Sequence, residues 1–599
     1  MPHPSSTSPR AARRRLAGEA LAALILHGAL VVWLTWPFVQ ELGVAFPLTE
    51  LIAVFDTRLV GWALAHQSQA LLSDPGSFFH GNVFHPAPHA LLHGEAGFGA
   101  LPLFLPVYAL SGNPTLALGL TFLGGVTLTA WTLHLVAREW TGSFLAGVVA
   151  GGAFLTTRWT LWSWVPAAPN YAVLFYLPLI VRASAAPMTR VSQMLALAAL
   201  VALQGAVSHY LAAAALGPLL LIGLWRLSQP SERRGGALLL GACGVGVVPL
   251  VFLYLPSLLL LRSDPGLVGR TAWKITKVTR TDLPWDLVAP SLPAAIAVPV
   301  AILIAVGIVL RLLAARWPGA AGVRRVWQVT GFWAFCGLLM APTPAVRWFG
   351  QPVRLPQFEI NRWLPLWEVI RVPSRLAVAS LIGLSLLAAL AFAECTGRLG
   401  ALGRLGPAAR RILTFACLST VAWLTYVSYA NGAWWPRHPN LRPLPAAYPS
   451  YEPGRPPTPF LDVLRGGRGP LLELPVDVDH QPTRYRQAAR AMYDSLAHWR
   501  PLLNGYSGYF PAGHAERMAL AAALPDRQAL AKLRAETGLE LVLVHRAELV
   551  PGPAMSAWYA IIEQGGRDDL ELLAAGGHTF LFRVRGGAEG SGRPAAATR

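Results

Sequence analysis

The sequence predicts an all-α polytopic membrane domain of about eleven transmembrane helices, followed by a small extracytoplasmic α/β or α+β domain. Of its 599 residues, 54% are hydrophobic and 13% are charged, and ordinary soluble domains carry roughly twice that charged share. The apolar residues form runs of about 20, the length that crosses a bilayer as a helix. A segment of ordinary polarity with strand-like patterns follows the last run.

The membrane helices are predicted from apolar runs that end at charges, prolines or glycines. They cover residues 18–38, 114–137, 143–157, 170–182, 191–206, 209–226, 236–261, 291–312, 326–342, 375–395 and 411–430. The apolar stretch 98–110 is shorter and contains Pro102 and Pro106. We expect this stretch to lie in the outer interface or to be re-entrant.

The arginines predict the orientation. With residues 1–16 as a basic cytoplasmic N-terminus, every short inner loop is basic, as the positive-inside rule requires. An odd number of spans then puts the residues after Asn431 outside. The net charge of +19 is spread along the edges of apolar runs, whereas a nucleic-acid-binding protein gathers its charge in one stripe.

The predicted organisation has five parts. They are the N-terminus 1–16, the membrane domain 17–430 with outer loops 40–113, 262–290 and 343–374, a Pro-rich linker 431–460, an extracytoplasmic domain 461–586 and a disordered tail 587–599. In the outer domain, strands are expected at 469–476, 539–545 and 578–585, and helices at 482–498, 514–535 and 555–574.

Cations in the outer loops contradict the charge bias and need an explanation. Lys274, Lys277 and Arg280 lie in one loop, and Arg371 and Arg375 lie in another. Acidic residues of the same loops or lipid head groups are one set of partners. A phosphate or diphosphate at the bilayer edge is the other, since Arg binds phosphate bidentately and Lys binds it as a point charge.

The first outer loop carries the candidate acids. Asp56 falls where a helix is expected to begin, so it is either a general base close to the membrane surface or a helix cap or ion-pair partner of Arg58. Asp74 precedes Pro75, so it is either a turn residue or a contact of the cavity or the acceptor.

Histidines form two further candidate groups. His80, His85, His89 and His93, with Glu95 beside them, suggest either a zinc site or interfacial loop residues that contact substrate. Pro86 and Pro88 prevent a helix that would align the pair His85 and His89. His209 and Tyr210 begin a span on the outer side, where they either line a cavity or pack as a helix end.

Four stretches carry a resemblance to a known family. They are GFGALPLFLPVYALSGNPTLAL from Gly97, VAREWTGS from Val136, R-V-P-S-R from Arg371, and H-W-R-P-L-L-N-G-Y-S-G-Y-F-P from His498 to Pro511. With the acid early in a long first outer loop, the chain resembles the type C (GT-C) glycosyltransferase superfamily, and within it bacterial members of unassigned substrate.

The resemblance implies an inner-membrane enzyme that moves a sugar from a polyprenyl-phosphate carrier to an envelope glycan, lipid or protein on the outer face. Asp56 then corresponds to the general base of an inverting transfer, and the outer-loop cations stabilise the leaving phosphate. Many members carry a second acid where this chain has Thr57 and Arg58. The resemblance therefore implies no certain cofactor and leaves the need for a divalent metal open.

Two other classes of function remain open. One is a non-catalytic membrane scaffold that binds envelope glycan. The other is a lipid or glycan transporter, for which ionisable residues deep in the spans are expected. Glu19 and His27 are the clearest of these.

Overall fold

The computed structural model describes residues 9–47, 54–264, 268–269, 279–280, 298–314, 321–341, 345–348, 351–354, 359, 363, 370, 372–401, 408, 411–412, 414–416, 418–419, 448, 450–451, 458–476 and 485–585. Two compact units are present. Unit 1 comprises Met1–Ala53, Ala96–Leu255 and Ala272–Glu452, and unit 2 comprises Val54–Glu95, Pro256–Thr271 and Pro453–Arg599. Residues from the expected first outer loop thus belong to the same unit as the C-terminal residues.

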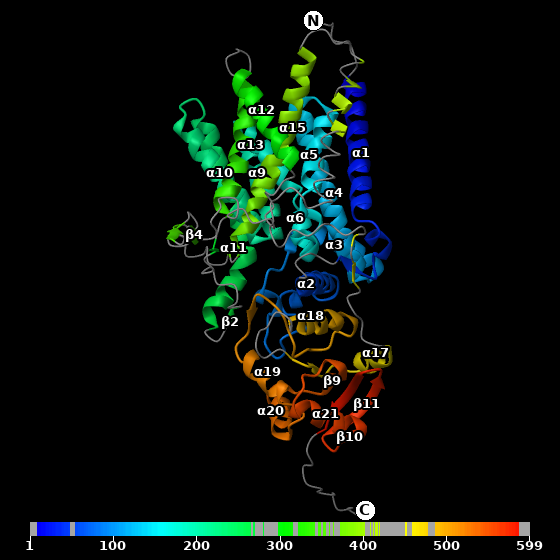
Figure 1. Ribbon diagram of the computed structural model, residues 1–599. Coiled ribbons are helices and arrows are strands. Elements are labelled where there is room, and N and C mark those ends of the chain that lie inside the picture. Colours follow the sequence, from blue (N-terminus) through cyan, green and yellow to red (C-terminus); the bar gives the residue numbers. More distant parts are fainter. Residues whose placement is uncertain are drawn as a thin grey trace, which may run out of the picture. The chain divides into compact units, whose positions relative to one another are not determined.

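Unit 1 is almost entirely helical (Figure 1). Its α-helices are α1 (Pro9–Leu34), α3 (Leu101–Ser111), α4 (Pro114–Thr141), α5 (Phe144–Leu155), α6 (Arg158–Leu161), α7 (Trp164–Ala167), α8 (Tyr176–Ala185), α9 (Val191–Val207), α10 (His209–Ser228), α11 (Arg233–Ser263, which continues into unit 2), α12 (Val298–Ala314), α13 (Ala321–Met340) and α15 (Val378–Ala401). Its 3-10 helices are η1 (Phe38–Glu41), η4 (Phe98–Ala100), η5 (Pro169–Ala172) and η9 (Pro373–Ala377).

Short strands complete unit 1. β1 (Phe46–Pro47) pairs with β6 (Ser450–Tyr451) in antiparallel fashion. β3 (Thr279–Arg280) pairs in parallel with β4 (Ala345–Trp348), and β4 pairs antiparallel with β5 (Gln351–Arg354).

Five helices among the described residues are long and apolar enough to cross a membrane. They are Arg13–Leu34, Pro114–Thr141, His209–Ser228, Arg233–Ser263 and Pro373–Gly397. A sixth span is present if Phe144–Leu155 and Arg158–Ala167, which are bent by 65° at their junction, count as one. The chain is therefore a multi-pass membrane protein, and the count of eleven spans stays a prediction, because most of 411–430 lies outside the described residues.

The stretch 98–110 forms η4 and the 11-residue helix α3. At about 1.5 Å per residue, α3 is too short to cross a bilayer core of roughly 30 Å. Its N-terminal turn contains Pro102, where the missing N–H costs nothing.

Polar contacts join the long helices of unit 1. α1 and α5 both pack against α4. Arg138 of α4 forms a 2.7 Å ion pair with Glu19 of α1. Nε2 of His27 in α1 lies 3.3 Å from Nδ1 of His134 in α4. The two ionisable residues that the sequence indicates within the spans therefore both join α1 to α4.

Unit 2 combines helices with a mixed sheet. Its helices are α2 (Val54–Ser73), η2 (Pro75–Ser77), η3 (Ala90–His93), α17 (Thr458–Arg465), α18 (Tyr485–Asp494), η10 (Ser495–Ala497), α19 (His514–Ala522), α20 (Arg527–Thr537), η11 (Arg546–Glu548) and α21 (Pro553–Glu563). Its strands are β2 (Val268–Gly269), β7 (Leu471–Leu474), β8 (Tyr509–Phe510), β9 (Leu541–His545), β10 (Gly566–Arg567), β11 (Leu570–Gly576) and β12 (Thr579–Val584).

The sheet of unit 2 has the order β10-β11-β12-β9-β7. β7 and β9 are parallel and the other pairs are antiparallel. Alternate residues of β7, β9 and β12 share one hydrophobic core with α19, α20 and α21: Leu472, Leu474, Val542, Val544, Phe582, Val584, Met518, Leu530, Leu533, Trp558 and Ile561. Because side chains alternate along a strand, Glu473 and His545 belong to the other face of the sheet.

Two expected helices of the outer domain are wrong in extent. The helix expected at 514–535 is divided into α19 and α20, because Pro525 interrupts the backbone hydrogen bonding between them. The helix expected at 555–574 ends at Glu563 and gives way to β10 and β11. Gly565 and Gly566 adopt φ of +72° and +126°, which ends the helix and reverses the chain.

Candidate functional site

Unit 1 holds Arg375 within a group of aromatic rings. The guanidinium carbon lies 3.6 Å from the centroid of the Trp164 ring, 4.8 Å from that of Tyr210 and 5.5 Å from that of Tyr171. One guanidinium nitrogen also donates to the Tyr171 hydroxyl at 3.3 Å. A cation over an aromatic face gains about 0.5–2 kcal/mol. We call Arg375, Trp164, Tyr171 and Tyr210 the aromatic box.

Local structure orients the tyrosines of the aromatic box. Ser208 caps α10 by accepting a hydrogen bond from the backbone N–H of Tyr210 at 3.1 Å. The Ser208 hydroxyl also donates to the Tyr171 hydroxyl at 2.9 Å. The Tyr210 hydroxyl accepts from the backbone N–H of Val372 at 3.2 Å. Both phenols are therefore fixed, one by a helix cap and one by the segment that leads to Arg375.

The sequence anticipated part of the aromatic box. Arg375 and Tyr210 were candidates, and they lie in contact. His209 contacts the neighbouring Tyr210 ring at 4.4 Å between centroids and also lies near Tyr254 of α11, at 6.4 Å. Trp164 and Tyr171 were missed, although the stretch from Trp159 to Tyr171 combines aromatic residues with prolines after an apolar run.

The remaining predicted phosphate ligands are not described in atomic detail. Lys274, Lys277 and Arg371 lie outside the described residues. The backbone of Arg280 forms part of β3, and its side chain is not described.

Asp56 lies in the first turn of α2, in unit 2. The hydroxyl of Tyr506 donates to its Oδ1 at 2.8 Å. Tyr506 in turn packs against Phe55 and Tyr485, at centroid distances of 5.4 and 5.2 Å. Asp56 therefore accepts a hydrogen bond from a residue of the motif His498 to Pro511, and the helix N-terminus favours its negative charge.

The other candidates of the first outer loop have structural contacts. Asp74 is exposed and accepts from the backbone N–H of Gly76 at 3.2 Å, as a turn residue does. The His85 Nε2 atom lies 3.0 Å from the carbonyl oxygen of Thr537. His93 is buried, and Glu95 is half-buried beside it in sequence.

Histidines of the first outer loop pack against other aromatic rings. His80 stacks on His89 with 4.5 Å between ring centroids, and His93 packs against Phe84 at 5.7 Å. Among the residues that the structure describes, no three His, Cys, Asp or Glu side chains come together as metal ligands. The described loop thus offers ring contacts and hydrogen bonds instead.

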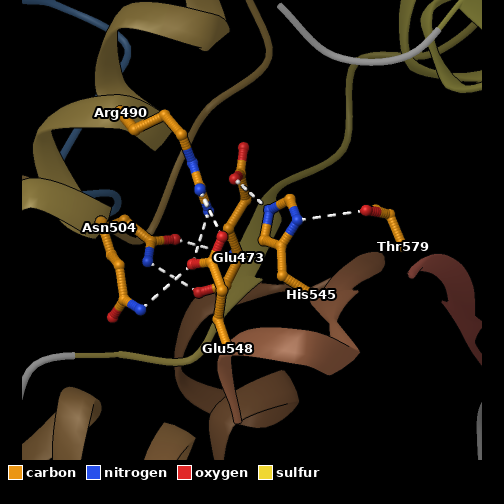
Figure 2. A network of polar contacts seen from close by, with 7 residues as sticks. Glu473, Arg490, Asn504, His545, Glu548 and Thr579 are labelled. Carbon is orange, nitrogen blue, oxygen red and sulfur yellow. Dashed lines mark hydrogen bonds and ion pairs between the residues drawn. The ribbon is translucent and has the colours of Figure 1, made fainter. Parts of the chain in front are cut away.

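A buried polar network that the sequence did not indicate lies on the second face of the unit 2 sheet (Figure 2). Nε2 of His545 lies 3.1 Å from Oε2 of Glu473, and its Nδ1 lies 3.3 Å from the Thr579 hydroxyl. Asn504 holds the backbone of Glu473 with two hydrogen bonds of 2.8 Å. Arg490 forms a bidentate pair with Glu548 at 2.5 and 3.0 Å.

Burial and charge shift the pKa values in this network. Burial raises the pKa of Asp494 to about 8, with the charge of Glu473 as a second cause. Burial lowers the pKa of His498 to about 4. Burial opposes the charged form of Glu473, but the hydrogen bond to His545 and its positive charge hold the pKa of Glu473 below its ordinary value. At neutral pH, Asp494 is therefore mostly protonated and Glu473 is ionised.

No family model matches the sequence, and no curated protein matches it. Among the solved structures that are similar to it are two of ArnT from Cupriavidus metallidurans. The apo structure is 14% identical, with a TM-score of 0.46, over 95% of this chain and 98% of ArnT. The structure bound to undecaprenyl phosphate is 13% identical, with a TM-score of 0.48, over 94% of this chain and 97% of ArnT.

Proposed function

We propose that this protein is a glycosyltransferase of the bacterial inner membrane that moves a sugar from a polyprenyl-phosphate carrier to an envelope acceptor on the outer face. The observation that carries the proposal is the aromatic box. Arg375 lies at the start of the apolar span Pro373–Gly397, next to the start of α10. A cation and aromatic rings at the end of apolar helices match a phosphate joined to an isoprenoid chain.

Arg375 has the chemistry to bind the carrier phosphate. Its guanidinium is charged at all physiological pH values and offers several N–H donors in one plane, which fits two phosphate oxygens at once. Trp164 stacks on the face of the guanidinium, and one N–H group at its edge donates to the Tyr171 hydroxyl. In the reaction, Arg375 stabilises the negative charge that grows on the leaving phosphate.

Asp56 has the chemistry of the base. It accepts the proton of the acceptor hydroxyl while the acceptor oxygen forms a bond to the anomeric carbon. The bond from that carbon to the phosphate oxygen breaks on the opposite side, and its electron pair stays on the phosphate. The configuration is inverted, and Asp56 returns its proton to solvent. The hydrogen bond from Tyr506 orients the carboxylate for this step.

The test compares purified wild type, Asp56→Asn and Arg375→Gln at equal folded amounts. Asn keeps the shape of the side chain but cannot accept the proton, so turnover of a polyprenyl-linked sugar should fall roughly 100-fold to 10,000-fold. Binding of undecaprenyl phosphate, measured by native mass spectrometry, should be unchanged in Asp56→Asn. In Arg375→Gln this binding should weaken about 10-fold to 100-fold.

Arg182→Gln is the matched control, because Arg182 pairs with Glu139 in the same unit and makes no contact with the aromatic box among the described residues. Equal lipid binding in Arg375→Gln and Arg182→Gln would contradict the role of Arg375. Equal turnover in wild type and Asp56→Asn would remove Asp56 from the mechanism.

A non-catalytic scaffold that binds envelope glycan is the second candidate function. Thr57 and Arg58 favour it, because many members of the superfamily have a second acid there. No turnover of any polyprenyl-linked donor by wild type would support the scaffold.

A further inference from the structure

Unit 2 contains a cavity of about 560 Å³ that no role above explains. Its walls come from the second half of α2, from residues 77–87 and from Trp499 and Pro501. Small-molecule sites typically measure about 300–1,000 Å³. The cavity is therefore large enough for a ligand of the size of a sugar or a disaccharide.

The wall contains a tryptophan in a conformation that is rare for a bulky residue. Trp499 has φ of +56° and is half-buried. Its backbone is fixed on both sides, because its N–H donates to the Ser495 carbonyl at 2.7 Å and the next carbonyl, of Arg500, accepts from Asn82 at 3.1 Å. Backbone strain of this kind persists only where the surroundings determine it, and it is frequent at binding sites.

The Arg500 side chain anchors the same segment. It is 3% exposed and donates to the backbone carbonyls of Leu464, Gly469 and Val463 at 2.5, 3.0 and 3.2 Å. The aromatic ring of Trp499 is thus presented to the cavity by a rigid support. A rigid aromatic wall binds a ligand without the cost of ordering a mobile side chain.

A buried imidazole faces the same cavity. His66 is 7% exposed, stacks on Trp62 at 5.6 Å between centroids and lies 6.4 Å from the Trp499 ring. Burial lowers the pKa of His66, so the ring is neutral at neutral pH. Backbone groups of Ser77 and Phe78 hydrogen-bond to the imidazole and hold it in place at the cavity wall.

The chemistry of the lining selects the ligand class. Of the described residues that line the cavity, none is Asp, Glu, Lys or Arg. Gln69, Ser73 and Ser77 add amide and hydroxyl groups to the imidazoles. Such a lining offers no Arg or Lys to a phosphate or an acidic sugar. It matches a neutral sugar, whose C–H face packs on an aromatic ring while its hydroxyls bind amides, hydroxyls and imidazoles.

We propose that this cavity binds a neutral sugar unit of an envelope glycan, with Trp499 as the stacking surface and the polar groups of Gln69, Ser73 and Ser77 as hydrogen-bonding partners. If the protein is a transferase, this glycan is the acceptor. If the protein is a scaffold, it is the glycan that the scaffold binds. Binding at this site requires no transfer reaction.

Binding is measured by saturation-transfer NMR on the full chain in lipid nanodiscs, because maltoside and glucoside detergents would compete. The probes are glucose, galactose, mannose and N-acetylglucosamine with their disaccharides, and glucuronic acid represents acidic sugars. Wild type should bind at least one neutral probe and should not bind glucuronic acid. Asp56→Asn should bind the neutral probe as wild type does, which separates this proposal from the proposed reaction.

Trp499→Gly is the decisive variant. Glycine adopts a positive φ without strain, so the fold is retained while the ring is lost. Affinity for the neutral probe should fall about tenfold. Trp499→Phe should retain part of the affinity for the neutral probe. The control is Tyr559→Ala, which removes a half-buried ring of α21 outside the cavity lining and should leave this affinity unchanged.

Gln69→Leu tests the hydrogen-bonding part of the lining, since it keeps the size of the side chain and removes the amide. It should weaken binding severalfold. No binding of any neutral probe, binding of glucuronic acid alone, or equal affinity in wild type and Trp499→Gly would each overturn the proposal.

Discussion

Replacing Asp494 by Asn should stabilise unit 2 at alkaline pH. Asp494 is 8% exposed, and its Oδ1 has no hydrogen-bond partner among the described residues. Burial and the nearby charge of Glu473 raise its pKa from 3.8 to about 8, although Arg490 and Arg58 act in the opposite direction. A shift of about four units corresponds to an upper limit on the order of 6 kcal/mol, at about 1.4 kcal/mol per unit.

The direction of the pH effect follows from the raised pKa. The folded state holds the Asp494 proton more tightly than the unfolded state does. This contribution to the free energy of unfolding is complete below about pH 4 and is lost as the pH rises to about 8. Asn is neutral at every pH, so the variant and wild type should be similar near pH 4 and should differ most near pH 9.

The measurement is hydrogen exchange of the full chain in micelles, followed by mass spectrometry between about pH 5 and pH 9. Exchange rates of peptides from β7, β9 and α18, corrected for the intrinsic effect of pH, give the free energy of opening. The control is Asp568→Asn, because Asp568 is exposed and forms a 2.6 Å ion pair with Arg527. This hydrogen bond lowers the pKa of Asp568, so its removal should bring no gain at alkaline pH.

Parallel pH profiles of wild type and Asp494→Asn would refute the reasoning. A variant that opens more readily than wild type at pH 9 would refute it as well, because it would mean that the ionised carboxylate stabilises the fold. A gain of equal size in Asp568→Asn would show that the effect comes from net charge and does not depend on burial.

Two further predictions concern the catalytic acid and the topology. Tyr506→Phe removes the hydroxyl that donates to Asp56 and retains the ring contacts. Turnover should therefore fall about tenfold, while carrier-lipid binding is unchanged. Undiminished turnover would exclude a positioning role for Tyr506. The topology is tested with Val550→Cys in a background without the native cysteines, because position 550 is 53% exposed. The new cysteine should react with a membrane-impermeant maleimide added to intact cells. Protection of this cysteine until the membrane is permeabilised would contradict an external C-terminal domain.

Properties that depend on residues close in sequence could be predicted from the sequence. Apolar runs predicted the long helices α4, α10, α11 and α15, because the cost of placing polar groups in lipid is set by each run's own composition. The strand-like pattern of residues 539–545 predicted a strand there, and β9 (Leu541–His545) lies within these bounds. The extent of the helix after 553 was predicted wrongly, because composition did not reveal that Gly565 and Gly566 would reverse the chain.

The sequence also indicated the candidate acid and the candidate cation, but it did not indicate which residues contact them. Asp56 was suggested by its place in the first outer loop, and Arg375 by its motif and by a charge on the unexpected side. Their hydrogen-bond partners could not be predicted, because they are distant in sequence. Tyr506 is 450 residues from Asp56 in sequence, and Tyr171 is 204 residues from Arg375.

The sequence by itself therefore determined where the long apolar helices α4, α10, α11 and α15 lie and which residue types are available for phosphate and proton chemistry. Only the tertiary structure decided that Arg375 lies among three aromatic rings, that Asp494 is buried beside Glu473, and that His66 and Trp499 face one cavity. The physical reason is that burial and contact depend on how distant segments pack together. Hydropathy and helix or strand preference depend mainly on residues close in sequence, and they carry no information about which distant side chains meet.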